Sequence, residues 1–169
     1  MSSHKRWSGA YLGQARADYE AALLIAGNGL TVSSASVVAM LLQMALEKFL
    51  KAAVYAGGAT PPRTHQVDRF LSLLKREAEH PLKSALEDAR PTLVELVLLH
   101  PALSQPDESG LDRNPQLEYP WLDGHDRVCF PAQDLSLAIR WSDDSNRELE
   151  RVRKFMQLLN KHFDKLFPS

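Results

Sequence analysis

The chain has 169 residues, of which 46 are Leu or Ala and only 15 are Ile, Val or Thr. Leu and Ala lose little freedom in a helix whereas β-branched residues favour strands, so this composition argues against a β-sandwich, a barrel or a parallel α/β sheet. The 20 basic and 21 acidic side chains give a net charge of −1, which excludes a global field that would drive the protein to nucleic acid or membrane. We therefore expect an all-α fold, in a single domain that covers residues 1–169.

The charges are distributed unevenly along the chain. Residues 1–80 carry a net charge of +3, residues 81–145 carry −7 and residues 146–169 carry +3. Two mildly basic ends therefore flank an acidic middle, a pattern that is not by itself a signature of nucleic-acid binding.

Two long helices are predicted at the start of the chain. The first runs from about Trp7 to Ala26, before Gly27-Asn28-Gly29. Its apolar residues recur at three- and four-residue steps and predict one inner face: Trp7, Tyr11, Ala15, Tyr19, Ala22, Leu23 and Ala26. The second helix is predicted from an N-cap within Ser33–Ser36 to about Ala56. It is apolar around much of its circumference, so we expect it to be the most buried helix.

Proline residues divide the next part of the chain. After Pro61 and Pro62, a third helix is predicted over about His65–Glu79, with Thr64 as its N-cap. The segments Leu82–Ala89 and Pro91–Leu99 are also predicted to be helical, either as one kinked helix or as two. In the second case Pro91 would suit a first-turn position.

A long proline-rich loop is predicted over about residues 101–133. Five of the ten prolines lie there, and a connection of this length inside a compact domain is usually functional or disordered. We expect Trp121, Phe130 and Trp141 to fold this loop onto the helices rather than to stack on bases.

The last predicted helix begins at Ser145, which forms a capping-box pattern with Glu148. Its apolar residues follow a heptad seam that faces either the bundle or a partner: Leu149, Val152, Met156, Leu159, Phe163 and Leu166. The expected fold is therefore an antiparallel up-and-down bundle of four or five helices, with the long loop before the last one.

Several kinds of chemistry are excluded by missing motifs. The standard phosphate loops, the nucleophile elbow and the His-Glu-x-x-His zinc motif are all absent. Cys129 is the one cysteine, so neither an internal disulfide nor a cysteine zinc site is available, and we expect a reducing cytoplasm. His125 between Asp123 and Asp126 is interpreted as a polar turn rather than a metal corner. We expect no metal, no other cofactor and no membrane span.

One segment carries a family resemblance. Residues 43–52, QMALEKFLKA, are similar to the second helix of the HEPN domain family, which shows a Gln-x-x-x-Glu-Lys-x-x-Lys-Ala pattern. The likeness continues through Gly57-Gly58, Pro61–His65 and Leu71–Leu74. Residues 117–120 resemble the family's Tyr-Pro segment, with Glu118 in place of the usual Arg.

The resemblance implies an up-and-down helical bundle that is often a homodimer and is frequently encoded beside a minimal nucleotidyltransferase in prokaryotic operons. For some members it also implies an RNase toxin that carries an Arg followed, after four to six residues, by a His. In that pair the Arg would hold a phosphate and the His would act in acid–base chemistry, in a cleft at the dimer interface.

No arginine of this sequence has a histidine at that spacing. Arg76 and His80 have three residues between them, which would place them about 40° apart on one helical face. Arg153 and His162 would lie about 180° apart on opposite faces, so they cannot share a site within one chain. RNase activity is therefore not expected, and Arg76 with His80 forms the nearest alternative.

Two groups of polar residues are candidates for binding. Glu47, Lys48 and Lys51 lie in the most buried predicted helix. They form either a polar strip that binds a nucleotide phosphate or a partner, or a solvated edge whose ion pair contributes only about 0.2–0.5 kcal/mol.

The second group, Arg63, Thr64 and His65, stands at a helix start, where backbone N–H groups favour a phosphate. The alternative is a simple Thr64 cap with His65 packed on the preceding helix. A basic stripe on the last helix is interpreted as a solvated face rather than a surface for RNA or an acidic partner: Arg147, Arg151, Lys154, Lys161 and Lys165.

The first functional hypothesis is a non-catalytic HEPN-like binding module, expected to be a homodimer. It would serve a nucleotidyltransferase partner, or bind nucleotide or RNA, in a toxin–antitoxin-like system. The alternative is a metal-independent RNase toxin that uses Arg76 and His80, or Arg63 and His65. A third hypothesis is a purely structural dimerisation protein.

Overall fold

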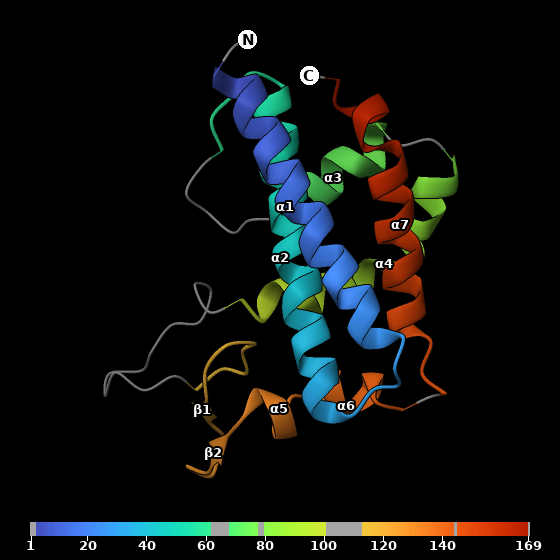
Figure 1. The fold of residues 1–169 in the computed structure, drawn as a ribbon. Helices are drawn as coiled ribbons and strands as arrows, with labels where there is room; N and C mark the ends of the chain where they lie inside the picture. Colours follow the sequence, from blue (N-terminus) through green and yellow to red (C-terminus); the bar gives the residue numbers. More distant parts are fainter. Residues whose placement is uncertain (1–2, 62–67, 78–79, 101–112, 144, 169) are drawn as a thin grey trace.

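The computed structural model describes residues 3–61, 68–77, 80–100, 113–143 and 145–168. Within these ranges the chain forms five long helices, two short helices and one antiparallel hairpin (Figure 1). The long helices are α1 (Ser3–Ala26), α2 (Val32–Ala56), α3 (Asp68–Glu77), α4 (His80–Leu98) and α7 (Glu148–Leu166). The short elements are β1 (Trp121–Leu122), β2 (Val128–Cys129), α5 (Pro131–Asp134) and α6 (Ser136–Trp141). The predicted all-α fold with antiparallel helix packing is confirmed.

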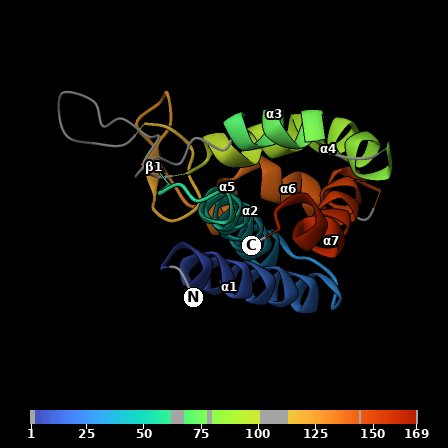
Figure 2. The same ribbon diagram turned by 90° about the horizontal axis from the view of Figure 1, so that it is seen from above.

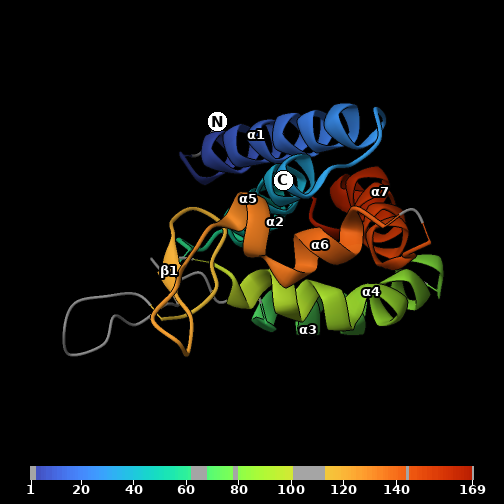
Figure 3. The ribbon, with the colours of Figure 1, turned by 90° about the horizontal axis from the view of Figure 1, so that it is seen from below.

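The second helix, α2, is the centre of the bundle. It runs antiparallel to α1, and the view from above places it between α1 and α4, with α7 beside them (Figure 2). The short helices α5 and α6 pack on α2 at the lower end of the bundle (Figure 3). The side chains of Leu42, Leu46 and Phe49 are almost fully buried, as expected for this helix. No helix in the described ranges is both long and apolar enough to cross a membrane.

The face of α1 that contacts α2 is made of small residues. Ser8, Ala15 and Ala22 lie seven residues apart and are all buried. The Ser8 hydroxyl donates a hydrogen bond to the carbonyl oxygen of Ala52 in α2, at 3.0 Å. Because the side chains at a helix–helix contact set the distance between the axes, these small residues let the two backbones approach closely.

The first helix differs from the prediction in its start and in its inner face. It begins at Ser3 rather than at about Trp7. The Trp7 side chain, predicted to lie on the inner face, is 52% exposed. Tyr11, Leu23 and Ala26 are only half-buried. Of the predicted inner face, Ala15, Tyr19 and Ala22 are buried as expected, whereas Trp7 lies at the rim.

The N-terminus of α2 lies before the predicted serines. Thr31 is the N-cap: its Oγ1 accepts a hydrogen bond from the Ser34 N–H at 3.2 Å, and the Ser34 Oγ accepts one from the Thr31 N–H at 2.9 Å. The predicted cap within Ser33–Ser36 is wrong because Ser34 serves as the reciprocal partner of the capping box. The predicted end at Ala56 is confirmed, and Gly58 follows with φ +77°, a conformation that favours glycine.

The fourth helix is continuous although it contains a proline. Of the two predicted arrangements, one helix is correct, and Pro91 lies within it rather than in a first turn. Pro91 is on the exposed side, where the carbonyl that loses its N–H partner can reach water. The third helix is described over Asp68–Glu77, inside its predicted span, and the rest of that span (residues 65–67 and 78–79) lies outside the described residues, as does its predicted N-cap Thr64.

The last helix begins without the predicted capping box. The Ser145 N–H and hydroxyl both donate to Asp143 Oδ1, at 2.9 and 2.8 Å, and these bonds lower the pKa of the Asp143 carboxyl. Arg147 is the N-cap, and the Asn146 side-chain oxygen accepts the Glu148 N–H at 2.7 Å. The predicted Ser145 capping box is wrong because the Ser145 hydroxyl donates to Asp143 instead of capping the helix.

The apolar seam of α7 faces the bundle. Five of its six predicted residues are buried and the sixth is half-buried: Leu149, Val152, Met156, Leu159 and Phe163, then Leu166. The rings of Phe163 and Phe49 have their centroids 5.4 Å apart, which joins α7 to α2. The seam therefore serves the core rather than a partner.

Part of the predicted loop carries structure. Residues 101–112 lie outside the described ranges, and the hairpin and α5 follow them. Trp121 and Trp141 are buried, as predicted. Phe130 is 44% exposed, so its predicted packing is wrong. It occupies the N-cap position of α5, where its N–H donates to Asp134 Oδ2 at 2.8 Å and its ring stays at the surface.

A single arginine of α6 joins two long helices. Arg140 Nη2 donates to Glu95 Oε2 of α4 at 2.6 Å, and Arg140 Nε lies 3.1 Å from Glu148 Oε2 of α7. Partial burial lowers the pKa of the guanidinium, but the bonds to the two carboxylates outweigh it and the net shift is upward. The network fixes α6 between α4 and α7.

We expect Arg140→Ala to lower the free energy of unfolding by about 1.5–3 kcal/mol, because it removes hydrogen bonds between charged groups on three helices. The matched control is Arg147→Ala, which removes only the exposed Arg147–Glu150 pair and is expected to cost less than about 1 kcal/mol. Urea unfolding followed by circular dichroism measures both. Equal losses would show that the Arg140 network contributes no more than a surface ion pair.

Candidate functional site

Two of the three predicted polar-strip residues form an ion pair on α2. Glu47 is 9% exposed, and the Lys51 Nζ lies 2.5 Å from its Oε1. The Nε2 of His100, just after α4, lies 3.5 Å from Glu47 Oε2. Because the carboxylate is buried between these two groups, this part of the strip is not the solvated edge that was one of the two interpretations.

The third residue of the strip holds α1 against α2. Lys48 Nζ pairs with Asp18 Oδ2 of α1, and Asp18 Oδ1 also accepts a hydrogen bond from Gln14 Nε2 at 2.9 Å. The Asp18 side chain is buried. A buried carboxylate requires a partner of opposite charge, so Lys48 has a structural role in this pair.

Four aromatic side chains gather beside Lys51, and we call them the aromatic platform: His4, Trp7 and Tyr11 of α1, with Tyr55 of α2. The Trp7 and Tyr55 rings are stacked with their centroids 6.2 Å apart, and the Tyr11 and Tyr55 rings are stacked at 5.7 Å. The His4 ring lies 5.9 Å from Tyr55. Lys51 Nζ lies 5.7 Å from the centroid of the Tyr11 ring, within the range of a cation–π interaction.

The platform could have been found in the sequence from the spacing of His4, Trp7 and Tyr11. These residues fall on one side of a helix, but the same spacing also fits an inner face. The platform and an inner face are distinguished by a second set of residues, Ser8, Ala15 and Ala22, which recur every seven positions. These small residues are better suited to close packing on α2.

The remaining predicted residues are described only in part. Arg63, Thr64 and His65 lie outside the described residues. Arg76 is in the last turn of α3, whereas His80 is the first residue of α4. Residues 78 and 79 between them lie outside the described residues, so their predicted arrangement on one helical face stays a prediction.

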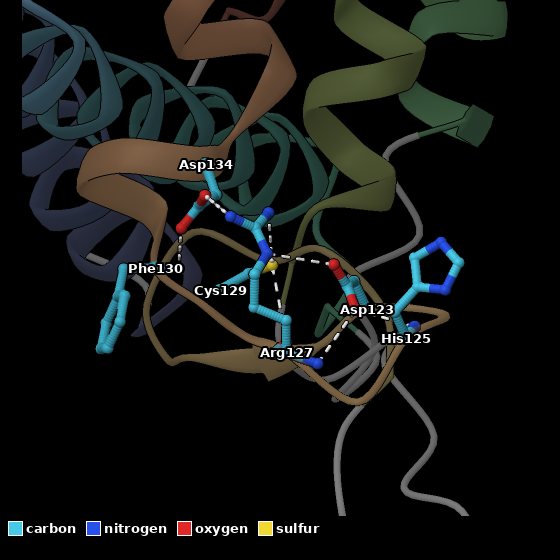
Figure 4. Close-up of polar contacts among 6 residues, drawn as sticks. All are labelled: Asp123, His125, Arg127, Cys129, Phe130 and Asp134. Atoms are coloured by element: carbon cyan, nitrogen blue, oxygen red, sulfur yellow. Dashed lines mark hydrogen bonds and ion pairs between the residues drawn. The ribbon is translucent and has the colours of Figure 1, made fainter.

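The polar turn between the strands is closed by its own residues (Figure 4). Asp123 Oδ1 accepts the His125 and Arg127 N–H groups at 2.8 and 3.0 Å, and these bonds lower the pKa of the Asp123 carboxyl. The Arg127 guanidinium bridges Asp123 and Asp134 and lies 3.4 Å from the buried Cys129 Sγ. The His125 ring points away from this cluster in Figure 4. The interpretation as a turn fits this geometry, and no group of three metal-ligating side chains occurs in the described ranges.

The platform and Lys51 together suit one kind of ligand. Exposed rings offer a flat apolar surface on which another planar ring can stack. The Lys51 ammonium beside them supplies a positive charge for an anionic group on the same ligand.

Comparison with known proteins gives one match. A family model described as HEPN domain matches residues 9–98, just over half of the chain, and this span covers most of α1 and all of α2, α3 and α4. No curated protein and no solved structure matches the chain. The family resemblance read from residues 43–52 is thereby confirmed.

We expect Lys48→Met to lower the free energy of unfolding by about 2–4 kcal/mol, because it leaves the Asp18 carboxylate buried without its cation. Adding Asp18→Asn should recover at least about 1 kcal/mol of this loss. Lys161→Met on the exposed side of α7 is the matched control, with an expected change within about 0.5 kcal/mol. Urea unfolding of the three variants and the unmodified protein measures the effect. A Lys48→Met protein as stable as Lys161→Met would contradict the structural role of the pair.

Proposed function

Because the chain belongs to the HEPN domain family, we propose that it is a non-catalytic binding module for a nucleotide. The observation that carries the proposal is the aromatic platform, in which Trp7 is exposed and the other three rings are half-buried, with Lys51 at its edge. The nucleobase would stack on Trp7 and Tyr55, and the phosphate would contact Lys51.

The exposure of Trp7 supports the stacking part of the proposal. The tryptophan ring is 52% exposed, so a large apolar surface faces water. Exposure of such a surface does not by itself stabilise the folded protein. Base–aromatic stacking contributes about 1–3 kcal/mol per base, and it tolerates different bases because every base has a flat face. The two stacked tyrosines behind Trp7 hold the platform in place.

The charges around the platform support the phosphate part. No acidic residue occurs between Ser3 and Ala17, whereas Lys5 and Arg6 lie in the first turns of α1 beside His4 and Trp7 in the sequence. Lys51 is one quarter exposed, so its ammonium keeps access to solvent while it pairs with Glu47. A positive field of this kind attracts a nucleotide phosphate.

The absence of catalysis is supported by the positions of the nearest Arg and His pairs. Arg76 and His80 do not have the spacing that the family's RNases use, and Arg153 and His162 lie nine residues apart on α7, about half a rotation around the helix. The homodimer and the nucleotidyltransferase partner that the resemblance implies stay predictions.

The nucleotide proposal is tested by titrating the protein with AMP and with adenosine while following tryptophan fluorescence. Trp121 and Trp141 are buried, so quenching by a stacked base should come from Trp7. We expect saturable quenching by both compounds and tighter binding of AMP. Lys51→Met should reduce the preference for AMP over adenosine by about tenfold, which corresponds to 1.4 kcal/mol.

Two variants serve as controls for this titration. Trp7→Ala should remove the quenching and weaken the binding of both AMP and adenosine. Tyr119→Ala changes another exposed aromatic residue far along the chain and should leave both affinities unchanged. An AMP preference that persists in Lys51→Met, or quenching that persists in Trp7→Ala, would refute the assignment of the site.

The non-catalytic part is tested by incubating the purified protein with a fluorescently labelled single-stranded RNA. We expect no cleavage above the level of the His80→Ala and His65→Ala variants, because no Arg–His pair has the spacing that the family's RNases use. Cleavage that either substitution abolishes would revive the RNase alternative and overturn the proposal.

A further inference from the structure

A second surface lies between α1 and α7, away from the aromatic platform. These helices are antiparallel, and the C-terminal half of α1 lies beside the N-terminal half of α7 (Figures 1 and 2). They are joined by polar contacts: Arg16 Nε donates to Asn160 Oδ1 at 2.9 Å, and the Tyr19 hydroxyl donates to the carbonyl oxygen of Arg153 at 3.3 Å. These contacts leave an open space between the helices on the solvent side.

This space is a groove of about 410 Å³, which we call the α1–α7 groove. Its lining residues are Tyr19 and Leu23 from α1, with Glu150, Arg153, Lys154 and Gln157 from α7. Burial of Tyr19 raises the pKa of its phenol, so the hydroxyl is neutral at the floor of the groove. The floor is therefore uncharged and partly apolar, and the α7 wall is charged.

The charge of the α7 wall is positive. Glu150 is paired with Arg147, whose Nη1 lies 2.9 Å from the Glu150 Oε1. Arg153 and Lys154 are exposed on this wall, and no ion pair of their charged groups occurs in the described ranges. Two cations thus remain available next to one compensated carboxylate.

The α1 wall is aliphatic. Leu23 lines the groove and is half-buried. Leu24, its neighbour in sequence, is 73% exposed at the same end of α1. A half-buried leucine in the groove, an exposed leucine next to it in the sequence and two exposed cations on the facing wall favour a partner that presents apolar and acidic side chains together.

From this lining we infer that the α1–α7 groove docks an acidic amphipathic helix of a partner protein. Leucine-type side chains of that helix would contact Leu23 and Leu24, and carboxylates one turn away would pair with Arg153 and Lys154. A groove that runs between two antiparallel helices suits the shape of a third helix, and an amphipathic helix in an apolar groove is a recurring mode of recognition. The site is distinct from the aromatic platform and does not rest on nucleotide binding.

The lining favours a protein over a nucleic acid. A single strand would gain from exposed rings on which bases stack, and the one ring in the groove, Tyr19, is buried. The side chains of Leu23 and Leu24 have neither a positive charge nor a hydrogen-bond donor for a sugar–phosphate backbone. The interpretation of the α7 stripe as a solvated face is therefore replaced, for Lys154, by a docking role.

The test uses a fluorescein-labelled synthetic peptide of about 20 residues, long enough to form a helix, with leucines on one face and glutamates beside them. Fluorescence anisotropy should give a dissociation constant on the order of 10–100 µM. The double variant Arg153→Glu/Lys154→Glu and the single variant Leu24→Asp should each weaken binding at least about tenfold. A peptide with glutamine in place of glutamate should bind at least about tenfold more weakly.

Lys161→Glu is the matched control, because it reverses one charge on the same helix outside the groove, and it should leave the affinity unchanged. The double variant should bind AMP with unchanged affinity. This measurement separates failure of this inference from failure of the proposed function. The inference is overturned by absence of peptide binding, by equal weakening in Lys161→Glu, or by binding of a 20-nucleotide oligouridylate in place of the peptide. Sedimentation that shows a dimer disrupted by the double variant would assign the groove to a second copy and overturn it as well.

Discussion

The close contact between α1 and α2 is the constraint on which the other features depend. Ser8, Ala15 and Ala22 bring the two backbones together, and the Ser8 hydroxyl satisfies its hydrogen bond on a carbonyl of α2. His4, Trp7 and Tyr11 of α1 gather at the edge of this contact, whereas Tyr19 is buried and bonds α7. The platform therefore lies at the edge of the contact that builds the core.

The same contact determines what the charges of α2 do. Lys48 forms an ion pair with Asp18 of α1. Lys51 lies at the edge of the α1–α2 contact, between the buried Glu47 and the ring of Tyr11. Three residues that look equivalent in the sequence thus have different roles: Lys48 pairs with Asp18 of α1, and Glu47 pairs with Lys51, whose ammonium keeps access to solvent. On the opposite side of α1, the polar bridges to α7 leave room for a groove. One helix, α1, therefore separates two surfaces of different character.

The sequence was sufficient for the fold because helix periodicity and breaker residues are local signals. The second helix, its end at Ala56 and the seam of α7 were predicted from spacing alone. Errors arose where two local patterns competed for the same residues. Ser145 and Glu148 have the spacing of a capping box, but the Ser145 hydroxyl and N–H donate to Asp143 instead. Trp7 and Tyr11 had core-like spacing, but a neighbouring series of smaller residues packed better. The candidate site was predictable only for Glu47, Lys48 and Lys51, since the contacts of Lys51 with Tyr11 and of Glu47 with His100 join distant segments.

The pairing of Asp18 with Lys48 also fixes the register of α1 on α2. A seven-residue repeat of small side chains would tolerate a shift of one helix along the other by seven residues, because similar surfaces would meet again. Such a shift would place Leu41 or Tyr55 near the Asp18 carboxylate instead of Lys48. The slipped arrangement would then hold a buried charge without a counter-ion, which is strongly unfavourable. A buried ion pair that adds little net stability can in this way select one alignment of two helices among several of similar packing.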